Sequence, residues 1–409
     1  MQLPNFYKQS LSTRRAILKE KNIPCLESLT NHSTDEVIFD HLVENYIAPF
    51  EQPLGVATNF VIDGREVLIP MVNEEPSVIA AASHAAKLAL PNGFKTKIID
   101  RKMTGQVVIE NVQHLEEKKQ YILQHKETLI QTVNHFRPSM IKRGGGVTDI
   151  DVKIFHDMNI LTVYFYVNTV DAMGANMINS LMEEIAPLLE EWTDGQTLLA
   201  ILSNYSDHCL VEASCSIPFT SINEEIAQKI VTANEYAKVD IVRATTHNKG
   251  IMNGVEAVVR ASGNDTRAVS AAIHAYASQD GQYKALTHYF IQDERLHAKI
   301  TLPLPIGCVG GATKVLPKAT ASLEMMGVKK ATDLMAIIAA VGLAQNIAAL
   351  KALVSEGIQK GHMNLQAKSL ALQVGATEDE IIQVAQQLKN KKTMTEEQAR
   401  QILSEIRKK

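Results

Sequence analysis

The sequence has few cysteines and few aromatic residues. It holds 4 cysteines and a single tryptophan among 409 residues, and aromatic residues make up 5% of the chain. The cysteines are scattered, with no Cys-x-x-Cys pair and no histidine-rich partner pattern: Cys25, Cys209, Cys215 and Cys308. This pattern suits a reducing cytosol and indicates neither a disulfide framework nor a zinc site. No metal is therefore expected.

An apolar signal region, an uninterrupted membrane span and an excess of positive charge are also missing. The longest apolar run, 334–353, is interrupted by Gln345, Asn346 and Lys351. It is therefore predicted to form a buried core helix rather than a membrane span. The net charge of −4 argues against nucleic-acid binding. We expect a cytoplasmic protein with no membrane or nucleic-acid partner.

The Gly-x-Gly-x-x-Gly fingerprint of Rossmann domains is absent, yet residues 104–207 read as a separate small domain. A chain of 409 residues is expected to form two or three domains. The small domain should contain strands at 107–112, 150–157, 161–169 and 197–206, and helices at 114–136 and 171–192. The run DAMGAN at 171–176 joins a strand to a helix whose first turn can face a pyrophosphate. By itself, this run is also typical of a plain strand-to-helix turn.

Capping patterns predict where several helices begin. Ser12 is expected to cap a first helix, and the box at 33–36 to open a helix that runs to about Tyr46. Boxes at 377–380 and 395–398 predict two short helices that form a C-terminal hairpin.

A pair of carboxylates stands where a predicted β-hairpin leads into an apolar helix. The alternating residues 59–71 predict the hairpin, with its turn at Asp63-Gly64. Pro76 fits the first position of the helix that follows. Glu75 then has two explanations, because it can cap the helix dipole or act as a general acid in an apolar site.

The stretch 242–269 sets charged and amide side chains among mostly apolar and small residues. It holds Arg243, Lys249, Asn253 and Asp265. Two glycines and a Gly-Asn-Asp turn are expected to break it where backbone passes close to another group. A lysine in apolar surroundings can serve as a cation beside a reacting carbonyl, with Asp265 holding its ammonium. A structural Lys–Asp pair explains the same residues.

These runs together resemble hydroxymethylglutaryl-CoA reductase of the soluble bacterial class II. The matching runs are RATTHNKGIMNG, GNDTRAV, PMVNEEPSVIAAAS, DAMGAN and GHM-x-L, and the resemblance covers nearly the whole chain. It implies an α+β fold with a large mixed α/β substrate-binding domain, an inserted small nucleotide-binding α+β domain and a C-terminal helical flap. The expected boundaries are 1–103 with 208–364 for the large CoA-binding and dimerisation domain, 104–207 for the small domain, and 365–409 for the flap.

The resemblance implies reduction of 3-hydroxy-3-methylglutaryl-CoA to mevalonate and CoA by two hydride transfers. The implied catalytic residues are Lys249 for the oxyanion, Glu75 as proton donor to the aldehyde, Asp265 between these two, and His362 on the flap for the CoA thiolate. The implied substrate contacts are Arg243, Asn253, Ser77, Thr246, Asn204 and Gln345. Lys8 is the implied contact of the CoA phosphates, although Tyr7 stands where the family has a cation.

The same resemblance places the dinucleotide at Asp171, Gly174 and Asn176. NADPH is expected rather than NADH, because the run before the glycine triplet carries Arg137, Lys142 and Arg143 and no acid. Solvated surface cations are the alternative explanation of these three residues.

A homodimer is also implied, with the active site at the subunit interface and Glu75 on a different chain from part of the catalytic set. Three other functions stay open from the sequence. They are oxidative action on mevalonate, a non-catalytic acyl-CoA-binding protein and another nicotinamide-dependent dehydrogenase. The four implied catalytic residues argue against the binding protein, which needs no acid–base set.

Overall fold

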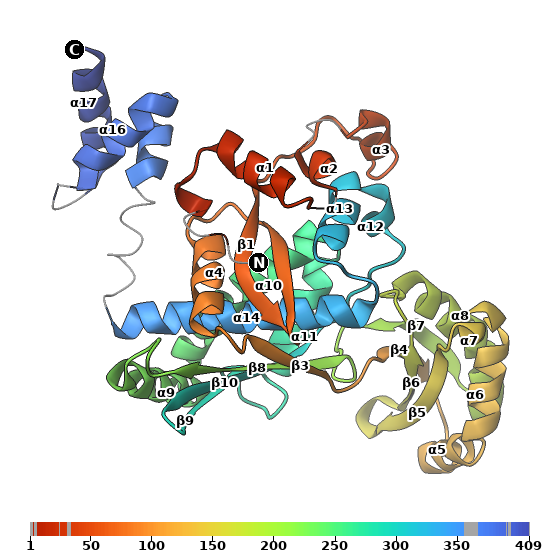
Figure 1. Ribbon diagram of the computed structural model, residues 1–409. Coiled ribbons are helices and arrows are strands. Elements are labelled where there is room, and N and C mark those ends of the chain that lie inside the picture. Colours follow the sequence, from red (N-terminus) through yellow and green to blue (C-terminus); the bar gives the residue numbers. More distant parts are fainter. Residues whose placement is uncertain are drawn as a thin grey trace.

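Two β-sheets and the helices around them make up the body of the protein (Figure 1). The computed structural model describes residue 3 and residues 6–23, 25–30, 34–355, 367–389, 391 and 394–408. The combination of two separate sheets with helices confirms the predicted α+β class.

The larger sheet has six strands in the order β2-β1-β3-β8-β10-β9. Their bounds are β1 Leu54–Ile62, β2 Arg65–Val72, β3 Phe94–Ile98, β8 Leu210–Pro218, β9 Thr287–Gln292 and β10 Arg295–Pro303. All neighbours are antiparallel except β1 and β3. Strands β1 and β2 form the predicted hairpin. Asp63 and Gly64 at its turn have φ of 50° and 82°, as a tight two-residue turn requires.

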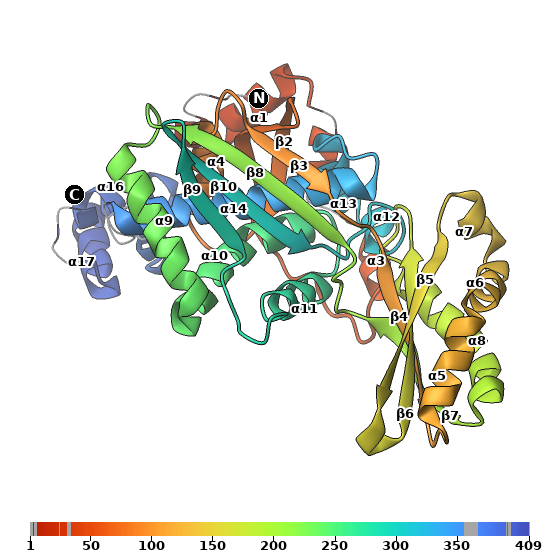
Figure 2. The same cartoon turned by 90° about the horizontal axis from the view of Figure 1, so that it is seen from below.

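The smaller sheet has four antiparallel strands in the order β5-β6-β4-β7. Its strands are β4 Met103–Glu110, β5 Gly146–Phe155, β6 Ile160–Asn168 and β7 Gln196–Ser203, and its helices are α5 Leu115–Gln124, α6 Lys126–His135, α7 Pro138–Lys142 and α8 Ala175–Thr193. The helices lie on one side of this sheet (Figure 2). The single helix predicted over 114–136 is two helices, because His125 leaves helical backbone angles (φ −101°, ψ 18°).

The remaining helices surround the larger sheet or follow it in the chain, except η2, which joins β5 to β6 of the smaller sheet. They are η1 Phe6–Lys8, α1 Leu11–Glu20, α2 Leu26–Thr30, α3 Glu36–Asp40, α4 Val78–Leu88, η2 His156–Met158, α9 Glu224–Val239, α10 Ile241–Ala261, α11 Thr266–Tyr276, α12 Ala312–Val315, α13 Pro317–Met325, α14 Ala331–Val354, α16 Glu378–Lys389 and α17 Glu396–Arg407.

Helix α14 lies at the centre of the body (Figure 1). It packs against α10, α4 and α9 and against strands β8, β3 and β10. Within the described ranges it is the one helix long and apolar enough to cross a membrane, yet 72% of its most apolar stretch is buried in the protein. The predicted core helix is therefore confirmed.

One predicted helix start and one predicted helix end are wrong. Ser10, rather than Ser12, caps α1, because Ser10 has the extended backbone of a cap and its Oγ accepts an N–H three residues on. Asp35 caps α3, which ends at Asp40 and does not reach Tyr46.

The predicted C-terminal helical hairpin is present. Thr395 caps α17 as the box at 395–398 predicts. Arg407 of α17 binds Glu380 of α16, with Nε and Nη2 at 2.8 and 2.9 Å from its carboxylate oxygens. These helices share an apolar core with Ala367 and Ala371 and lie apart from the body in Figure 1.

The stretch 242–269 forms α10, a turn and α11. The prediction that glycines break it is wrong for Gly250 and Gly254, which lie inside one continuous helix. Gly254 nevertheless permits a close approach. A Cβ added there would lie 3.1 Å from side-chain atoms of both Gln345 and Val341 on α14.

Replacing Gly254 by alanine should lower the free energy of unfolding by roughly 1–3 kcal/mol, because the added methyl group overpacks the contact with α14. Gly250→Ala is the matched control. Nothing lies within 4 Å of its added Cβ, so the loss of a helical glycine should stabilise the protein by up to about 1 kcal/mol. Thermal unfolding followed by circular dichroism measures both, and equal effects would contradict the close approach at Gly254.

Candidate active site

One face of α10 carries a row of polar side chains. Arg243, Thr246, Lys249 and Asn253 are separated by three, three and four residues, which places them on one side of the helix. The opposite side packs into the core. The apolar surroundings predicted for Lys249 are not observed, because its side chain is 61% exposed. Helix α10 thus gathers four predicted site residues at one surface.

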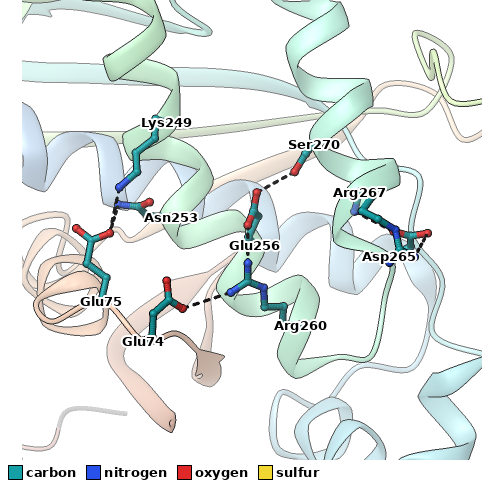
Figure 3. Close-up of polar contacts among 9 residues, drawn as sticks. All are labelled: Glu74, Glu75, Lys249, Asn253, Glu256, Arg260, Asp265, Arg267 and Ser270. Carbon is teal, nitrogen blue, oxygen red and sulfur yellow. Dashed lines mark hydrogen bonds and ion pairs between the residues drawn. The ribbon is translucent and has the colours of Figure 1, made fainter. Parts of the chain in front are cut away.

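The loop between β2 and α4 brings Glu75 to this face (Figure 3). Its Oε2 lies 3.0 Å from Nζ of Lys249 and accepts from Nδ2 of Asn253 at 3.4 Å. The carboxylate therefore binds α10 and does not cap α4. This arrangement favours the chemical explanation of Glu75 over the capping one.

Ser77 combines backbone strain with a buried hydroxyl. Its φ of 80° delays the start of α4 to Val78, so the prediction that Pro76 is the first helical residue is wrong. The left-handed region costs a residue with a side chain roughly 1–2 kcal/mol. Ser77 Oγ is buried and has no hydrogen-bond partner among the described residues. Such features cluster at ligand-binding positions, which supports the predicted substrate contact.

A cavity of about 260 Å³ opens beside the Lys249–Glu75 pair, with Arg260 and Glu74 in its wall. Arg260 lies 3.5 Å from the carboxylate of Glu74 and 3.0 Å from that of Glu256, which also accepts from Ser270 Oγ at 2.8 Å. Figure 3 shows this row running along α10 from the pair. Sequence reasoning missed it, although the four-residue spacing of Glu256 and Arg260 is a visible signal for a helical ion pair.

Asp265 lies at the start of α11, away from Lys249 in Figure 3. It accepts from the backbone N–H groups of Arg267 and Ala268 at 2.8 and 3.2 Å and pairs with the Arg267 guanidinium at 3.1 Å. Burial alone would raise the pKa of Asp265, but these hydrogen bonds outweigh burial and hold the pKa below its ordinary value. The predicted contact between Asp265 and the Lys249 ammonium is therefore not observed, and Glu75 takes that place.

A buried polar network anchors α10 behind its polar face. His247 Nε2 lies 2.7 Å from Thr287 Oγ1 and 3.1 Å from Asn346 Nδ2. Tyr289 donates its hydroxyl to Asn346 Oδ1 at 2.7 Å. Desolvation, with a smaller effect from the charge of Arg243, lowers the pKa of His247 to about 4. A neutral His247 therefore helps to hold the polar face in its orientation.

Acidification from pH 6.5 to 4 should destabilise the protein. The unfolded chain protonates His247 near pH 6.5, whereas the folded chain does so only near pH 4, so the unfolded state alone takes up this proton between the two values. The complete effect is roughly 3 kcal/mol. Urea unfolding at pH 7 and at pH 4.5 measures it.

The variant His247→Gln should reduce the loss of stability between the two pH values. His135→Gln is the control, because His135 is exposed. An unchanged pH dependence in His247→Gln would contradict the assignment to His247.

The turn between β6 and α8 leaves a helix N-terminus open. Gly174 (φ 88°) precedes α8, no side chain caps the helix, and no acidic residue stands in its first turn. The N–H groups of this turn, with Asn176 exposed beside them, can therefore face an anion. A Cβ on Gly174 would lie 2.6 Å from Thr169 Cγ2. Asp171 Oδ1 accepts the Ala331 N–H of α14 at 2.8 Å, so this carboxylate joins the turn to the core helix.

Of the three cations predicted near the dinucleotide, Arg137 is already paired. Its guanidinium donates to both carboxylate oxygens of Glu184, at 2.9 and 2.5 Å. Lys142 and Arg143 are exposed, and neither forms an ion pair in the described ranges of the chain. The structure therefore favours Lys142 and Arg143 over Arg137 for a 2′-phosphate.

The other predicted residues lie away from the polar face of α10. Gln345 is buried in α14, and its Oε1 has no partner within the described part of the chain. Asn204 is exposed just after β7, and Lys8 is exposed at the end of η1. His362 lies outside the described residues.

A family model of hydroxymethylglutaryl-coenzyme A reductase matches residues 10–367. The chain belongs to this family. A reductase of Archaeoglobus fulgidus is 39% identical over 418 residues, which cover 99% of this chain and 94% of that protein. The resemblance predicted from the sequence is thereby confirmed.

Solved structures of the Streptococcus pneumoniae reductase have the same fold. One is 40% identical, with a TM-score of 0.85 over 99% of this chain and 100% of that chain. Another, described as class II and bound to NADPH in open conformations, is 41% identical, with a TM-score of 0.83 over 98% of this chain and 100% of that chain. The chain is therefore similar to a class II reductase along its whole length.

Proposed function

We propose that this member of the hydroxymethylglutaryl-CoA reductase family reduces 3-hydroxy-3-methylglutaryl-CoA to mevalonate and CoA with NADPH. The contact of Lys249 with Glu75, at 3.0 Å beside a cavity, carries the proposal. A cation next to an acid suits carbonyl reduction, because one group stabilises the oxyanion and the other delivers a proton. The similarity to a reductase bound to NADPH supports the choice of dinucleotide.

Each step of the proposed reaction uses a named side chain. Two NADPH molecules, bound one after the other, would each supply one hydride. Lys249 stabilises the oxyanion that develops on the thioester carbonyl, and Glu75 donates a proton to the aldehyde oxygen in the second reduction. His362 protonates the departing CoA thiolate, and the resemblance alone supports this role. A role for Asp265 between Lys249 and Glu75 requires its carboxylate to leave Arg267.

Arg243 is the proposed clamp for the free carboxylate of the hydroxymethylglutaryl group. Its planar guanidinium can bind a carboxylate with two parallel hydrogen bonds. Its backbone N–H is fixed by the Asp240 side chain at 2.8 Å. Asn253 in the wall of the cavity, Thr246 on the same face of α10 and Ser77 beside Glu75 would position the same group. The resemblance adds Asn204 and Gln345.

The dinucleotide is proposed to lie on the open N-terminus of α8, at Gly174 and Asn176. Lys142 and Arg143 would then bind the 2′-phosphate. Lys8 would contact the CoA phosphates. These assignments rest on the exposed positions of the side chains and on the resemblance.

Lys249→Ala should lower the rate of NADPH oxidation by about 100-fold or more, because it removes the oxyanion stabiliser. CoA binding should change little. The assay follows the loss of reduced-nicotinamide absorbance with hydroxymethylglutaryl-CoA as substrate. The wild-type enzyme should oxidise two molecules of NADPH for each molecule of hydroxymethylglutaryl-CoA. Lys87→Ala is the matched control, because Lys87 is exposed at the end of α4.

Two results would count against the proposal. Turnover retained in Lys249→Ala would refute the role of this lysine. No oxidation of NADPH or NADH by wild type would leave the family membership standing and remove the proposed activity. CoA and acyl-CoA binding would then be measured.

The preference for NADPH over NADH tests the roles proposed for Lys142 and Arg143. The double change Lys142→Ser with Arg143→Ser should raise the KM for NADPH about 10-fold or more, since it removes partners of the 2′-phosphate, and leave the KM for NADH unchanged. Arg137→Ser is the control, because Arg137 is held by Glu184. If Arg137→Ser raised the KM for NADPH more than the double change does, the 2′-phosphate would be assigned to Arg137 instead.

We further propose three domains, 1–103 with 208–364, 104–207 and 365–409, and a homodimer in the cytoplasm. The two sheets and the separate apolar core of the C-terminal helices support the division. An exposed apolar patch beside Arg243 supports an interface near the site: Tyr236, Val239, Ile241 and Val242. Lys249 and Glu75 meet within one chain, so the second chain would complete the site without supplying this pair. The four free cysteines suit the cytoplasm.

A further inference from the structure

The smaller sheet is joined to the larger one by two segments that lie side by side. The chain leaves through residues 99–102 and returns through residues 204–209. Ile99 donates its N–H to the Leu210 carbonyl at 2.9 Å, Leu210 donates to the Asp100 carbonyl at 3.0 Å, and Lys102 donates to the His208 carbonyl at 2.7 Å. Figures 1 and 2 show the smaller sheet at one end of the body, beyond β3 and β8.

Arg101 lies in this joint and binds three separate parts of the chain. Its Nη2 donates to the carbonyl of Ala172 at 2.9 Å and to that of Ile306 at 2.7 Å. Its Nη1 donates to Sγ of Cys209 at 3.3 Å. Ala172 belongs to the turn before α8, whereas Ile306 follows β10 of the larger sheet. One half-buried guanidinium therefore connects the dinucleotide turn to the substrate-binding part of the chain.

The planar shape of the guanidinium makes this connection specific to arginine. Cys209 is fully buried; desolvation raises the pKa of its thiol, with an opposing but smaller effect of Arg101. The neutral thiol donates to the Leu304 carbonyl at 3.1 Å and accepts from Arg101. A planar guanidinium keeps its N–H groups at fixed angles, so it sets the spacing of its acceptors in a way that a flexible ammonium does not.

The residues next to Ile306 continue the connection to the catalytic face. Gly307 donates its N–H to Asn264 Oδ1 at 2.8 Å, and Asn264 precedes Asp265 in the turn after α10. Cys308 donates its N–H to the Asp171 carbonyl at 2.9 Å. A Cβ on Gly307 would lie 2.5 Å from the Met173 nitrogen, so the dinucleotide turn and this loop are in direct backbone contact.

We propose that Arg101 is a positioning residue for hydride transfer, because it fixes the dinucleotide turn 171–174 against residues 306–308 of the substrate-binding part. This inference rests on the proposed reductase function. Hydride transfer needs the reacting atoms within about 3–3.5 Å, and a displacement of about 1 Å costs roughly 100-fold in rate. The turn would hold the dinucleotide that donates the hydride, and α10 carries the groups proposed to hold the carbonyl that accepts it. The joint would therefore set the distance between the hydride donor and the carbonyl carbon.

A single-turnover experiment tests this role. The enzyme loaded with NADPH is mixed with excess hydroxymethylglutaryl-CoA, and the absorbance of the reduced nicotinamide is followed. The rate constant reports the geometry of transfer, and the amplitude reports the fraction of competent enzyme. NADPH deuterated at the transferred position identifies the hydride step, and nicotinamide fluorescence measures the Kd for NADPH.

Arg101→Met should lower the rate constant by about 10- to 100-fold. The amplitude and the Kd for NADPH should stay within about twofold of wild type. Arg101→Lys keeps the charge without the planar fork, so its rate constant should fall between those of wild type and Arg101→Met. Gly307→Ala, whose added Cβ would lie 2.5 Å from the Met173 nitrogen of the same turn, should slow the step with Arg101 intact. It keeps the test open if Arg101→Met does not fold.

Arg295→Met is the matched control. Arg295 donates to Ser216 Oγ and to the Ser216 carbonyl at 3.1 and 3.0 Å within the larger sheet, away from the joint, so its loss should leave the rate constant unchanged.

The outcomes separate the two proposals. If wild type oxidises no NADPH, the proposed function fails. If wild type is active but Arg101→Met and Gly307→Ala lose only amplitude at an unchanged rate constant, the role of Arg101 is structural and the positioning proposal is overturned.

Discussion

The close packing of α10 on α14 is the constraint on which the site depends. At Gly254 the absence of a side chain lets the two helices approach. The buried bonds of His247 to Thr287 and Asn346 then fix the rotation of α10 about its own axis. Because one side of the helix is committed to the core, the polar side from Arg243 to Asn253 has one available direction, toward the loop that carries Glu75.

The ion pair between Lys249 and Glu75 on that polar side contributes little to the stability of the fold. Lys249 and Glu75 are 61% and 41% exposed, and exposed pairs of this kind contribute about 0–1 kcal/mol to stability. The buried network of His247 does the structural work from the other side of the same helix. Helix α10 thus packs into the core on one face and presents the proposed catalytic and substrate-binding side chains on the other.

The sequence predicted the features that depend on short-range patterns. The hairpin turn at 63–64, the core helix α14 and the strand-to-helix turn before α8 are all visible as local composition and spacing. The residues of the polar face were found in the same way, because Arg243, Lys249 and Asn253 share one run and one helix.

Long-range partners were beyond such patterns. Asp265 was the predicted partner of Lys249 because it lies close in sequence, whereas the carboxylate that binds it is 174 residues away. Arg137 was likewise predicted to bind the dinucleotide, but in the structure it pairs with Glu184, which lies 47 residues later in the sequence. Backbone strain at Ser77 was hidden as well, because nothing in the local sequence distinguishes a left-handed serine from the first residue of a helix.

The paired connections of the smaller sheet have an evolutionary consequence. Because the chain leaves and returns at adjacent residues, the smaller sheet is an insertion whose two ends meet at one place. Its interior can then accept substitutions with little effect on the packing of α10 and α14. Selection for a different dinucleotide would act on the proposed site at the N-terminus of α8, whereas Arg243, Lys249 and Asn253 on α10 lie outside that part of the chain.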